Sequence, residues 1–199
     1  MVDVKRQLVI VHPPKTAGQA VQEALGLGRH WITGDDVWRH DTLGEIREKM
    51  PEAADWRTAL LVRNPYDRLE SFYHYTNGGS KHADGPVKQV LESYSSFKEF
   101  VENTDFQALF AYASGLHPKQ AKLMPMVWYA RGGRLEDMIT IIRQEKLEAG
   151  LQQFVIGPIK VDLVNATNRP SELWTELMRG RVYKAFKEDF DVFGYDSLI

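Results

Sequence analysis

A lysine and an arginine each follow a short apolar segment, at places where parallel strands commonly end. Lys15 stands in the loop after residues 8–11, Leu-Val-Ile-Val, and Arg63 comes directly after residues 58–62, Thr-Ala-Leu-Leu-Val. Arginine binds phosphate or sulfate oxygens through a planar fork of donors, whereas lysine acts as a mobile point charge. These two residues therefore suit the binding of an anionic group and the stabilisation of charge that builds on it.

The segment around Lys15 is predicted to be a strand, a tight loop and a helix. Two prolines in residues 12–15 end the apolar strand, and Gly18 permits a close approach to the loop. Small or apolar residues then recur at helical spacing: Ala20, Val21, Ala24 and Leu25. The backbone amides of residues 16–19 should be free donors at the amino terminus of that helix, which is a site for anions. An ordinary turn with a surface lysine is the alternative that this segment alone leaves open.

The segment after Arg63 follows the same plan. Asn64 is a good N-cap, Pro65 suits the first helical position, and Asp67 falls where a capping box places its acceptor. Ser71 lies eight residues after Arg63, about two turns into the predicted helix. The guanidinium and the serine hydroxyl are therefore candidates for gripping one phosphate together.

Strands that alternate with helical segments predict an α/β domain of three layers, in which helices flank a central, mainly parallel sheet. Such sheets bind ligands outside the carboxyl ends of their strands, so Lys15 and Arg63 are expected to share one crevice. Further helices are predicted at 43–50, 87–95, 97–102, 105–114, 171–178 and through 182–190. Strands are predicted at 30–33 and 135–142, and a flexible loop at 77–86.

Composition favours one enzyme-like domain over residues 1–199. The hydrophobic content of 43% is ample for a core, and a net charge of −2 argues against a nucleic-acid partner. The chain has no cysteine, which excludes disulfides and thiolate metal sites, and its histidines show no ligand spacing, so we expect no metal. No apolar run reaches the roughly 20 residues of a membrane span, and no signal peptide is recognisable. We therefore expect a cytoplasmic protein.

Pro-Pro-Lys-Thr-Ala-Gly at 13–18 and Val-Arg-Asn-Pro-Tyr-Asp-Arg-Leu-Glu-Ser-Phe-Tyr at 62–73 together resemble the sulfotransferase family that uses 3'-phosphoadenosine 5'-phosphosulfate (PAPS), particularly its carbohydrate-modifying branch. Residues 39–50 and 182–195 continue the resemblance, whereas 76–135 match only loosely. The resemblance implies a P-loop-like nucleotide site in which the first motif holds the 5'-phosphosulfate and the second holds the 3'-phosphate. The donor-binding residues it implies are Lys15, Thr16, Ala17, Gly18, Gln19, Ala20, Arg63 and Ser71.

One departure from the family pattern concerns the loop. The family usually has Thr or Ser at the two positions after the loop glycine, where this chain has Gln19 and Ala20. Hydroxyl contacts to the 5'-phosphate are thereby lost, so Lys15, Thr16 and backbone amides are expected to do the binding.

The reaction implied is sulfuryl transfer to an acceptor hydroxyl, which leaves adenosine 3',5'-bisphosphate as product and needs no metal. Lys15 is expected to stabilise the leaving oxygen, and His40 to act as the base, because an unperturbed histidine pKa of about 6.5 suits that task. Asp41 is a candidate to orient His40, and Glu45 is a rival base. A partly exposed histidine beside a helix cap remains the plainer interpretation of His40, and His12 is expected to support the loop.

Two other function classes stay open. A nucleotide kinase or ATPase also uses a strand, a loop and a helix, but in its P-loop pattern the glycines precede the lysine, whereas here Gly18 follows Lys15. A non-catalytic nucleotide- or glycan-binding module is the third possibility, because Gln19 and Ala20 depart from the family loop. The expected partners of an enzyme are the nucleotide donor and an acceptor hydroxyl on a glycan or a small alcohol.

Overall fold

The computed structural model describes residues 1–27, 40–78, 86–116, 122–133, 139–162 and 172–197. Its contacts divide the chain into two compact units, each made of two segments. The first unit comprises Met1–Arg63 and Met126–Thr167, and the second comprises Asn64–Pro125 and Asn168–Ile199. The single domain predicted from the sequence stays a prediction.

The first unit is built on a four-stranded sheet in the order β1-β2-β3-β4. Its strands are β1 (Val2–Asp3), β2 (Leu8–Val11), β3 (Arg57–Val62) and β4 (Ile139–Arg143). Its helices are α1 (Gly18–Ala24), α2 (Leu43–Lys49), α7 (Met126–Tyr129) and α8 (Leu147–Leu151), with short 3₁₀ turns at Pro51–Ala53, Gln144–Lys146 and Gln152–Phe154. Strands β2, β3 and β4 are parallel and β1 pairs antiparallel with β2. The predicted mixed α/β class, with a mostly parallel sheet flanked by helices, is confirmed.

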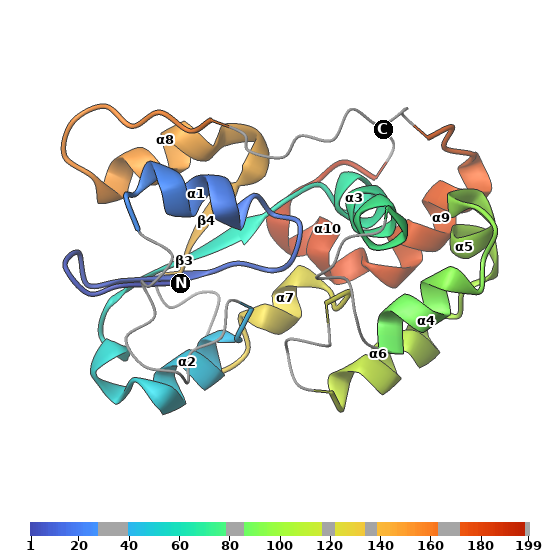
Figure 1. The fold of residues 1–199 in the computed structure, drawn as a ribbon, viewed down its shortest axis with the longest axis horizontal. Helices are drawn as coiled ribbons and strands as arrows, with labels where there is room; N and C mark the ends of the chain where they lie inside the picture. Colours follow the sequence, from blue (N-terminus) through green and yellow to red (C-terminus); the bar gives the residue numbers. More distant parts are fainter. Residues whose placement is uncertain (28–39, 79–85, 117–121, 134–138, 163–171, 198–199) are drawn as a thin grey trace. The chain divides into compact units, whose positions relative to one another are not determined.

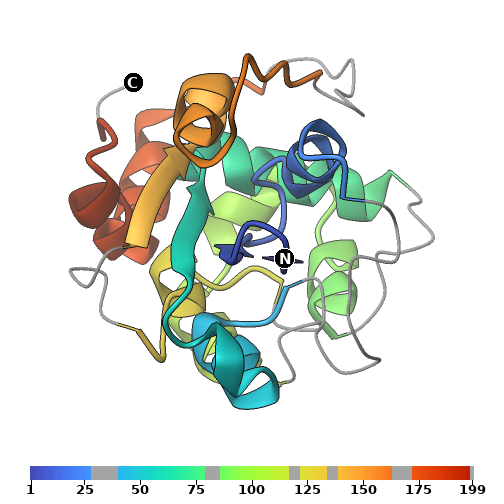
Figure 2. The same ribbon diagram turned by 90° about the vertical axis from the view of Figure 1, so that its left-hand side faces the viewer.

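Helices cover both faces of this sheet, as Figures 1 and 2 show. Helices α1 and α8 lie over one face, and α2 and α7 lie over the other. The side chains packed under α1 and α8 include Leu8, Ile10, Ala59, Leu61 and Ile142. Because strand residues two apart point to the same face, the near-continuous apolar runs of β2 and β3 supply core to both faces.

A contact between two glycines holds the segment after α7 against the first turn of α2. The Gly44 amide donates to the Arg131 carbonyl oxygen at 2.8 Å, and a Cβ built on Gly132 would lie 2.3 Å from the Cα of Gly44. Real Cβ atoms do not approach backbone atoms so closely, so a side chain at residue 132 would force one of the two backbone segments to shift. Gly132 also has a φ of +85°, which L side chains rarely adopt.

Gly132→Ala should therefore destabilise the protein more than Gly157→Ala. Gly157 has a φ of +89° but nothing within 4 Å of an added Cβ, so it reports backbone strain alone, about 1–2 kcal/mol. Gly132→Ala should lose about 1–3 kcal/mol more, because the clash with Gly44 is added to the strain. Urea denaturation of both variants measures the difference, and equal losses would show that the glycine contact carries no stability.

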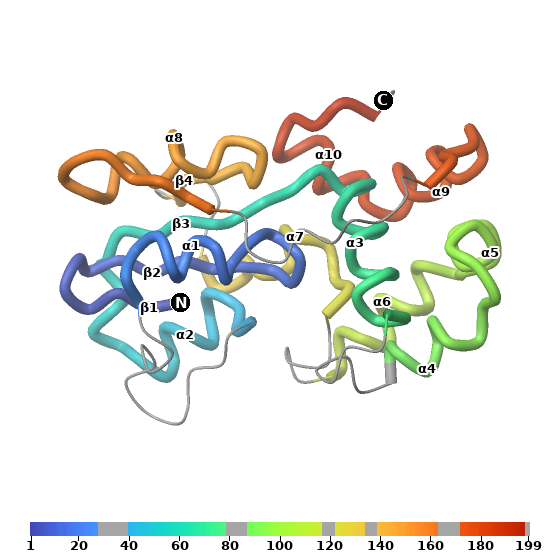
Figure 3. The backbone as a smooth tube through the Cα atoms, turned by 45° about the horizontal axis from the view of Figure 1, so that its top comes forward, coloured from blue at the N-terminus to red at the C-terminus, as the bar shows by residue number. Residues whose placement is uncertain are grey.

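The second unit, described by itself, is helical. Its helices are α3 (Pro65–Asn77), α4 (Pro86–Glu92), α5 (Phe97–Asn103), α6 (Phe106–Ser114), α9 (Glu176–Ala185) and α10 (Lys187–Phe193), which Figure 3 traces along the chain. Aromatic rings fill its interior, and the Tyr73, Phe97, Phe100, Phe106, Phe110 and Phe186 rings form a continuous series of contacts. The Arg181 side chain closes the end of α5 by donating to the Val101 and Thr104 carbonyl oxygens at 2.9 and 2.7 Å.

The closing part of the chain forms two helices, as predicted, but the boundary between them differs from the one predicted between 178 and 182. Val182, Phe186 and Phe190 are all buried, as their spacing indicates, but α9 ends at Ala185 and α10 begins at Lys187. Phe186 has a φ of −110° and a ψ of +25°, outside the helical range, so the apolar face continues across a break. The start predicted at 171 lies outside the described residues, and α9 begins at Glu176 behind the Thr175 cap.

Candidate functional site

The predicted site residues of the first unit gather at the carboxyl ends of adjacent parallel strands. Strands β2 and β3 pair with Val11 opposite Leu60, and β3 and β4 pair with Val62 opposite Arg143. The loop that carries Lys15 therefore leaves the same edge of the sheet as Arg63. This is the edge at which parallel α/β sheets bind their ligands.

Arg63 makes a direct contact with the Lys15 loop. Its guanidinium Nη1 donates to the Lys15 carbonyl oxygen at 3.3 Å, and its backbone amide donates to the Met126 Sδ at 3.3 Å. The second contact comes from α7, whose Met126 is fully buried. The backbone and the side chain of Arg63 thus both contact first-unit elements. The two cationic residues identified in the sequence, Lys15 and Arg63, lie together.

The loop itself has an unusual backbone. Lys15 and Ala17 have positive φ values of 70° and 64°, although neither is glycine. The conformation costs an L-residue roughly 1–2 kcal/mol, so the surrounding contacts must hold it. One such contact is the Thr16 hydroxyl, which is buried and donates to the Pro13 carbonyl oxygen at 2.7 Å. Turns that contain left-handed residues are among the places where successive backbone N–H groups form a concave anion site.

The two positions that depart from the family pattern lie in the first turn of α1. The Gln19 side chain is exposed, and its amide donates to the Glu23 carboxylate one turn later at 3.3 Å. Ala20 is buried and contributes to the packing of α1. The Ala17 side chain cannot cap α1, so no N-cap side chain takes up the first amides of the helix.

Gly18 has a role that the sequence did not suggest, because its close approach is to a side chain of this protein. A Cβ on Gly18 would lie 2.3 Å from Nδ1 and 2.7 Å from Cε1 of His12. The His12 ring is only 4% exposed and lies directly against the glycine. The expectation that His12 supports the loop agrees with this packing, and the residue type at Gly18 follows from it.

His40 is held against the same histidine. Its Nδ1 lies 3.0 Å from the His12 carbonyl oxygen, and the two rings meet edge to face with their centroids 4.8 Å apart. A carbonyl oxygen only accepts hydrogen bonds, so this contact assigns the proton of a neutral His40 to Nδ1. The lone pair of His40 is then on Nε2, the form that a general base needs. The sequence named His40 but contained no signal of its contact with His12.

Asp41 forms an ion pair with a lysine side chain at the far end of α2. Its carboxylate is buried and accepts from the Lys49 ammonium at 2.9 Å. Burial lowers the pKa of the Met1 amino group to about 5, and the Asp41 charge acts against that shift. Asp41 therefore has a structural charge partner, Lys49, besides the orienting role predicted for it.

Glu45 forms a capping box with Thr42 at the start of α2. Its Oε2 accepts from the Thr42 amide at 2.8 Å and from the Thr42 hydroxyl at 2.6 Å, and the Thr42 hydroxyl accepts from the Glu45 amide. Its other oxygen lies 3.6 Å from the Arg131 guanidinium, which stacks on the Trp128 ring. Both carboxylate oxygens of Glu45 thus face donors within the first unit. The geometry favours His40 over Glu45 as the base.

Ser71 lies on α3, in the second unit, with its side chain largely buried. Two features of the predicted start of that helix are confirmed: Asn64 caps it by accepting from the Tyr66 amide at 2.9 Å, and Pro65 is its first residue. The capping-box role of Asp67 stays a prediction. Arg63 belongs to the first unit, so the shared grip of Arg63 and Ser71 on one phosphate stays a prediction.

No protein-family model, curated protein or solved structure matches this chain. Within the described ranges, no group of three or more His, Asp or Glu side chains is placed to hold a metal ion. Among the described helices, none has the length and apolar character needed to cross a membrane.

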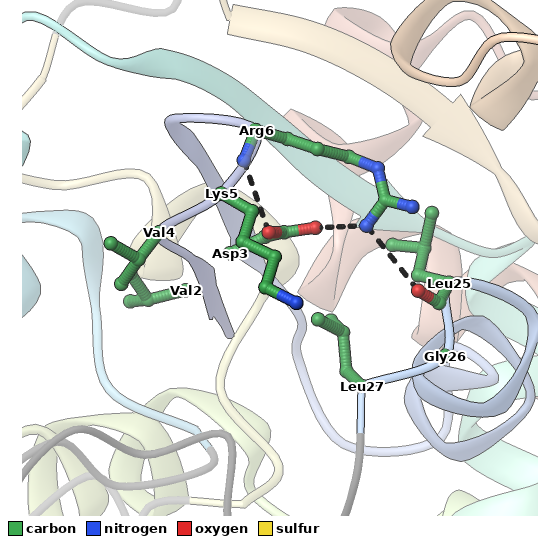
Figure 4. Close-up of a pocket in the computed structure, with 8 residues that line it drawn as sticks. All are labelled: Val2, Asp3, Val4, Lys5, Arg6, Leu25, Gly26 and Leu27. Carbon is green, nitrogen blue, oxygen red and sulfur yellow. Dashed lines mark hydrogen bonds and ion pairs between the residues drawn. The ribbon is translucent and has the colours of Figure 1, made fainter.

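A pocket of about 570 Å³ lies elsewhere in the first unit (Figure 4). It is lined by Val2, Asp3, Val4, Lys5, Arg6, Leu25, Gly26 and Leu27. The Arg6 guanidinium forms an ion pair with Asp3 and donates to the Leu25 carbonyl oxygen at 3.3 Å. Asp3 pairs with Leu8, at the beginning of β2, so this pocket is at the opposite end of the sheet from Lys15 and Arg63.

Proposed function

We propose that this chain is a sulfotransferase that moves a sulfuryl group from PAPS to an acceptor hydroxyl on a glycan or a small alcohol. One observation carries the proposal: the Arg63 guanidinium donates to the Lys15 carbonyl oxygen, at the carboxyl edge of two adjacent parallel strands. Lys15 and Arg63, one from each motif that resembles the PAPS-binding segments of the family, are 48 residues apart in sequence and meet in this contact.

The donor set fits a nucleotide with two separate anionic groups. The Lys15 ammonium and the N–H groups of the strained loop, which lies between β2 and α1, suit the 5'-phosphosulfate. Arg63, with Ser71, is assigned to the 3'-phosphate. Gln19 and Ala20 supply no hydroxyl, so backbone amides of residues 16–20 carry the contacts that Thr or Ser would make.

The chemistry assigned to the chain needs a base and a cation. The acceptor oxygen forms a bond to sulfur while the bond from sulfur to the 5'-phosphate oxygen breaks, and adenosine 3',5'-bisphosphate leaves. His40 Nε2 takes the hydroxyl proton, and Lys15 neutralises the charge that develops on the leaving oxygen. Positioning and charge stabilisation supply most of the catalysis, as in phosphoryl transfer, and no metal takes part.

Adenosine 3',5'-bisphosphate should bind and stabilise the protein, and calorimetry with the full chain tests the proposal. At a concentration of about 100 times Kd, linkage predicts a gain of roughly 2.7 kcal/mol in the free energy of unfolding. 5'-AMP, which lacks the 3'-phosphate, should bind more weakly, and ATP with magnesium should give no comparable shift. A preference for ATP with magnesium would instead support a kinase. Tight bisphosphate binding without turnover across an acceptor panel would support a non-catalytic module.

Arg63→Ala and Ser71→Ala should weaken the same interaction to different degrees. Removing the charged fork should cost about 1.5–3 kcal/mol of bisphosphate binding, and removing the neutral hydroxyl about 1 kcal/mol. Neither variant should change the affinity for 5'-AMP by a similar amount, because that ligand has no 3'-phosphate. Variants that keep their bisphosphate affinity and lose 5'-AMP binding would show that the two phosphates are assigned the wrong way round.

A further inference from the structure

We propose that His12 is a positioning residue that fixes the tautomer of His40 and ties it to the Lys15 loop. The catalytic consequence rests on the proposed function, because it assumes that His40 is the base and that the loop holds the donor. The structural part of the proposal rests only on the contacts of His12, Gly18 and His40. All three residues belong to the first unit.

On the side of the Lys15 loop, His12 lies against Gly18. The ring lies so close to Gly18 that an added Cβ would come within 2.9 Å of three of its atoms. Gly18 is the first residue of α1 and directly follows the strained Lys15–Ala17 segment. Any movement of the loop toward an anion must therefore move the His12 ring or be resisted by it, since buried groups at van der Waals contact have no room to yield.

His12 also contacts His40, the proposed base. Two contacts join His40 to His12: its Nδ1–H donates to the His12 carbonyl oxygen at 3.0 Å, and its ring packs edge to face on the His12 ring. The first contact selects the tautomer, and the second limits rotation of the imidazole. In hydrolases an acidic side chain performs this task for a catalytic histidine. Here a backbone carbonyl and an imidazole ring do so.

The backbone carbonyl and the side chain of His12 have different roles in holding His40. The carbonyl oxygen is present whatever the side chain, so the side chain acts by packing: it holds the main chain at residue 12 between Gly18 and His40. A flat ring of similar size should therefore replace it, and a methyl group should not. This distinguishes a packing role from proton transfer by the His12 imidazole.

The tautomer of His40 can be measured by nitrogen-15 NMR of the histidine side chains in the full-length protein, without any ligand. We expect wild-type His40, once deprotonated, to carry its proton on Nδ1. His12→Phe should preserve that tautomer, whereas His12→Ala should release His40 into a mixture of both forms. Wild-type His40 with its proton on Nε2 would overturn the proposal without recourse to any variant, as would a His12→Ala protein whose tautomer is unchanged.

Gly18→Ala gives an independent route to the same result, should His12→Ala fail to fold. The added methyl group should displace the His12 ring and produce the tautomer mixture. Gly180→Ala is the matched control, because nothing lies within 4 Å of a Cβ at that position. A folded Gly18→Ala protein with the wild-type tautomer would contradict the proposal.

Kinetics separate this inference from the proposed function. With PAPS and an acceptor, His12→Ala should lower kcat about 10- to 100-fold through misplacement of the base, and His12→Phe should restore most of it. A His12→Phe protein as slow as His12→Ala would overturn the packing role. If the tautomer responds as expected and adenosine 3',5'-bisphosphate does not bind, the proposed function fails and the positioning role stands. If the bisphosphate binds and the tautomer does not respond, the proposed function stands and the positioning role fails.

Discussion

His40→Ala is expected to lower turnover by 10²- to 10⁴-fold while binding of adenosine 3',5'-bisphosphate stays within about twofold of wild type. The reason is that His40 supplies the Nε2 lone pair for the acceptor proton, and its assigned role includes no contact with the nucleotide. The acid limb of the pH profile should disappear with it, because that limb reports protonation of the base. Steady-state rates from pH 5 to 8, with calorimetry of the bisphosphate, measure both effects.

His40→Asn is the matched control for a structural role. The asparagine amide retains a donor for the His12 carbonyl oxygen, the partner of His40 Nδ1, but cannot accept the proton. It should preserve the melting temperature and still lose turnover like His40→Ala. A folded His40→Ala protein that keeps most of its rate would remove His40 from the mechanism. Glu45 or Asp41 would then be the next base to test.

The parts of the fold that were predicted correctly are those with strong local signals. The β2 and β3 segments are short apolar runs bounded by residues that end strands, and the α2, α3 and α5 starts are marked by side-chain caps. A cap is a contact between residues two or three apart, so the sequence contains both partners. The helix predicted at 105–114 begins one residue later, because Asp105 is its N-cap and accepts from the Ala108 amide.

The parts that were missed depend on packing between distant segments. Strand β1 has two residues and exists only because it pairs with β2, and α7 and α8 have four and five residues. Elements this short have no periodicity to detect, and their helices are stable only in tertiary contact. The strand predicted at 30–33, most of the loop at 77–86 and the start of the strand at 135–142 lie outside the described residues.

The site was predictable to the extent that it follows from strand ends. Lys15 and Arg63 could be placed at one edge because both follow buried strands, but their contact required β2 and β3 to be neighbours, which the sequence cannot specify. The contacts of His12 with Gly18 and His40 were not predictable, because a histidine 28 residues from its partner leaves no local pattern. Gly18 was correctly identified as a site of close approach, but the group that approaches it is the His12 ring.

Lys15→Ala is expected to lower turnover by about 10²- to 10³-fold and to lower bisphosphate affinity by much less. The ammonium is assigned to the leaving oxygen, whose charge is greatest in the transition state, so its loss should appear mainly in kcat. Lys5→Ala is the control for a general loss of positive charge, because Lys5 lines the pocket at the other end of the sheet. Steady-state kinetics with PAPS, together with calorimetry of the bisphosphate, give the two numbers.

Lys15→Gly separates this catalytic role from the strain in the loop. Both variants remove the ammonium, but glycine adopts the φ of +70° without the roughly 1–2 kcal/mol that alanine must meet. Lys15→Gly should therefore lose as much turnover as Lys15→Ala while unfolding at a higher urea concentration. Equal turnover losses with unequal stabilities would assign the rate effect to the missing charge. A Lys15→Gly enzyme that recovers wild-type turnover would show that the loop conformation, and not the ammonium, governs the reaction.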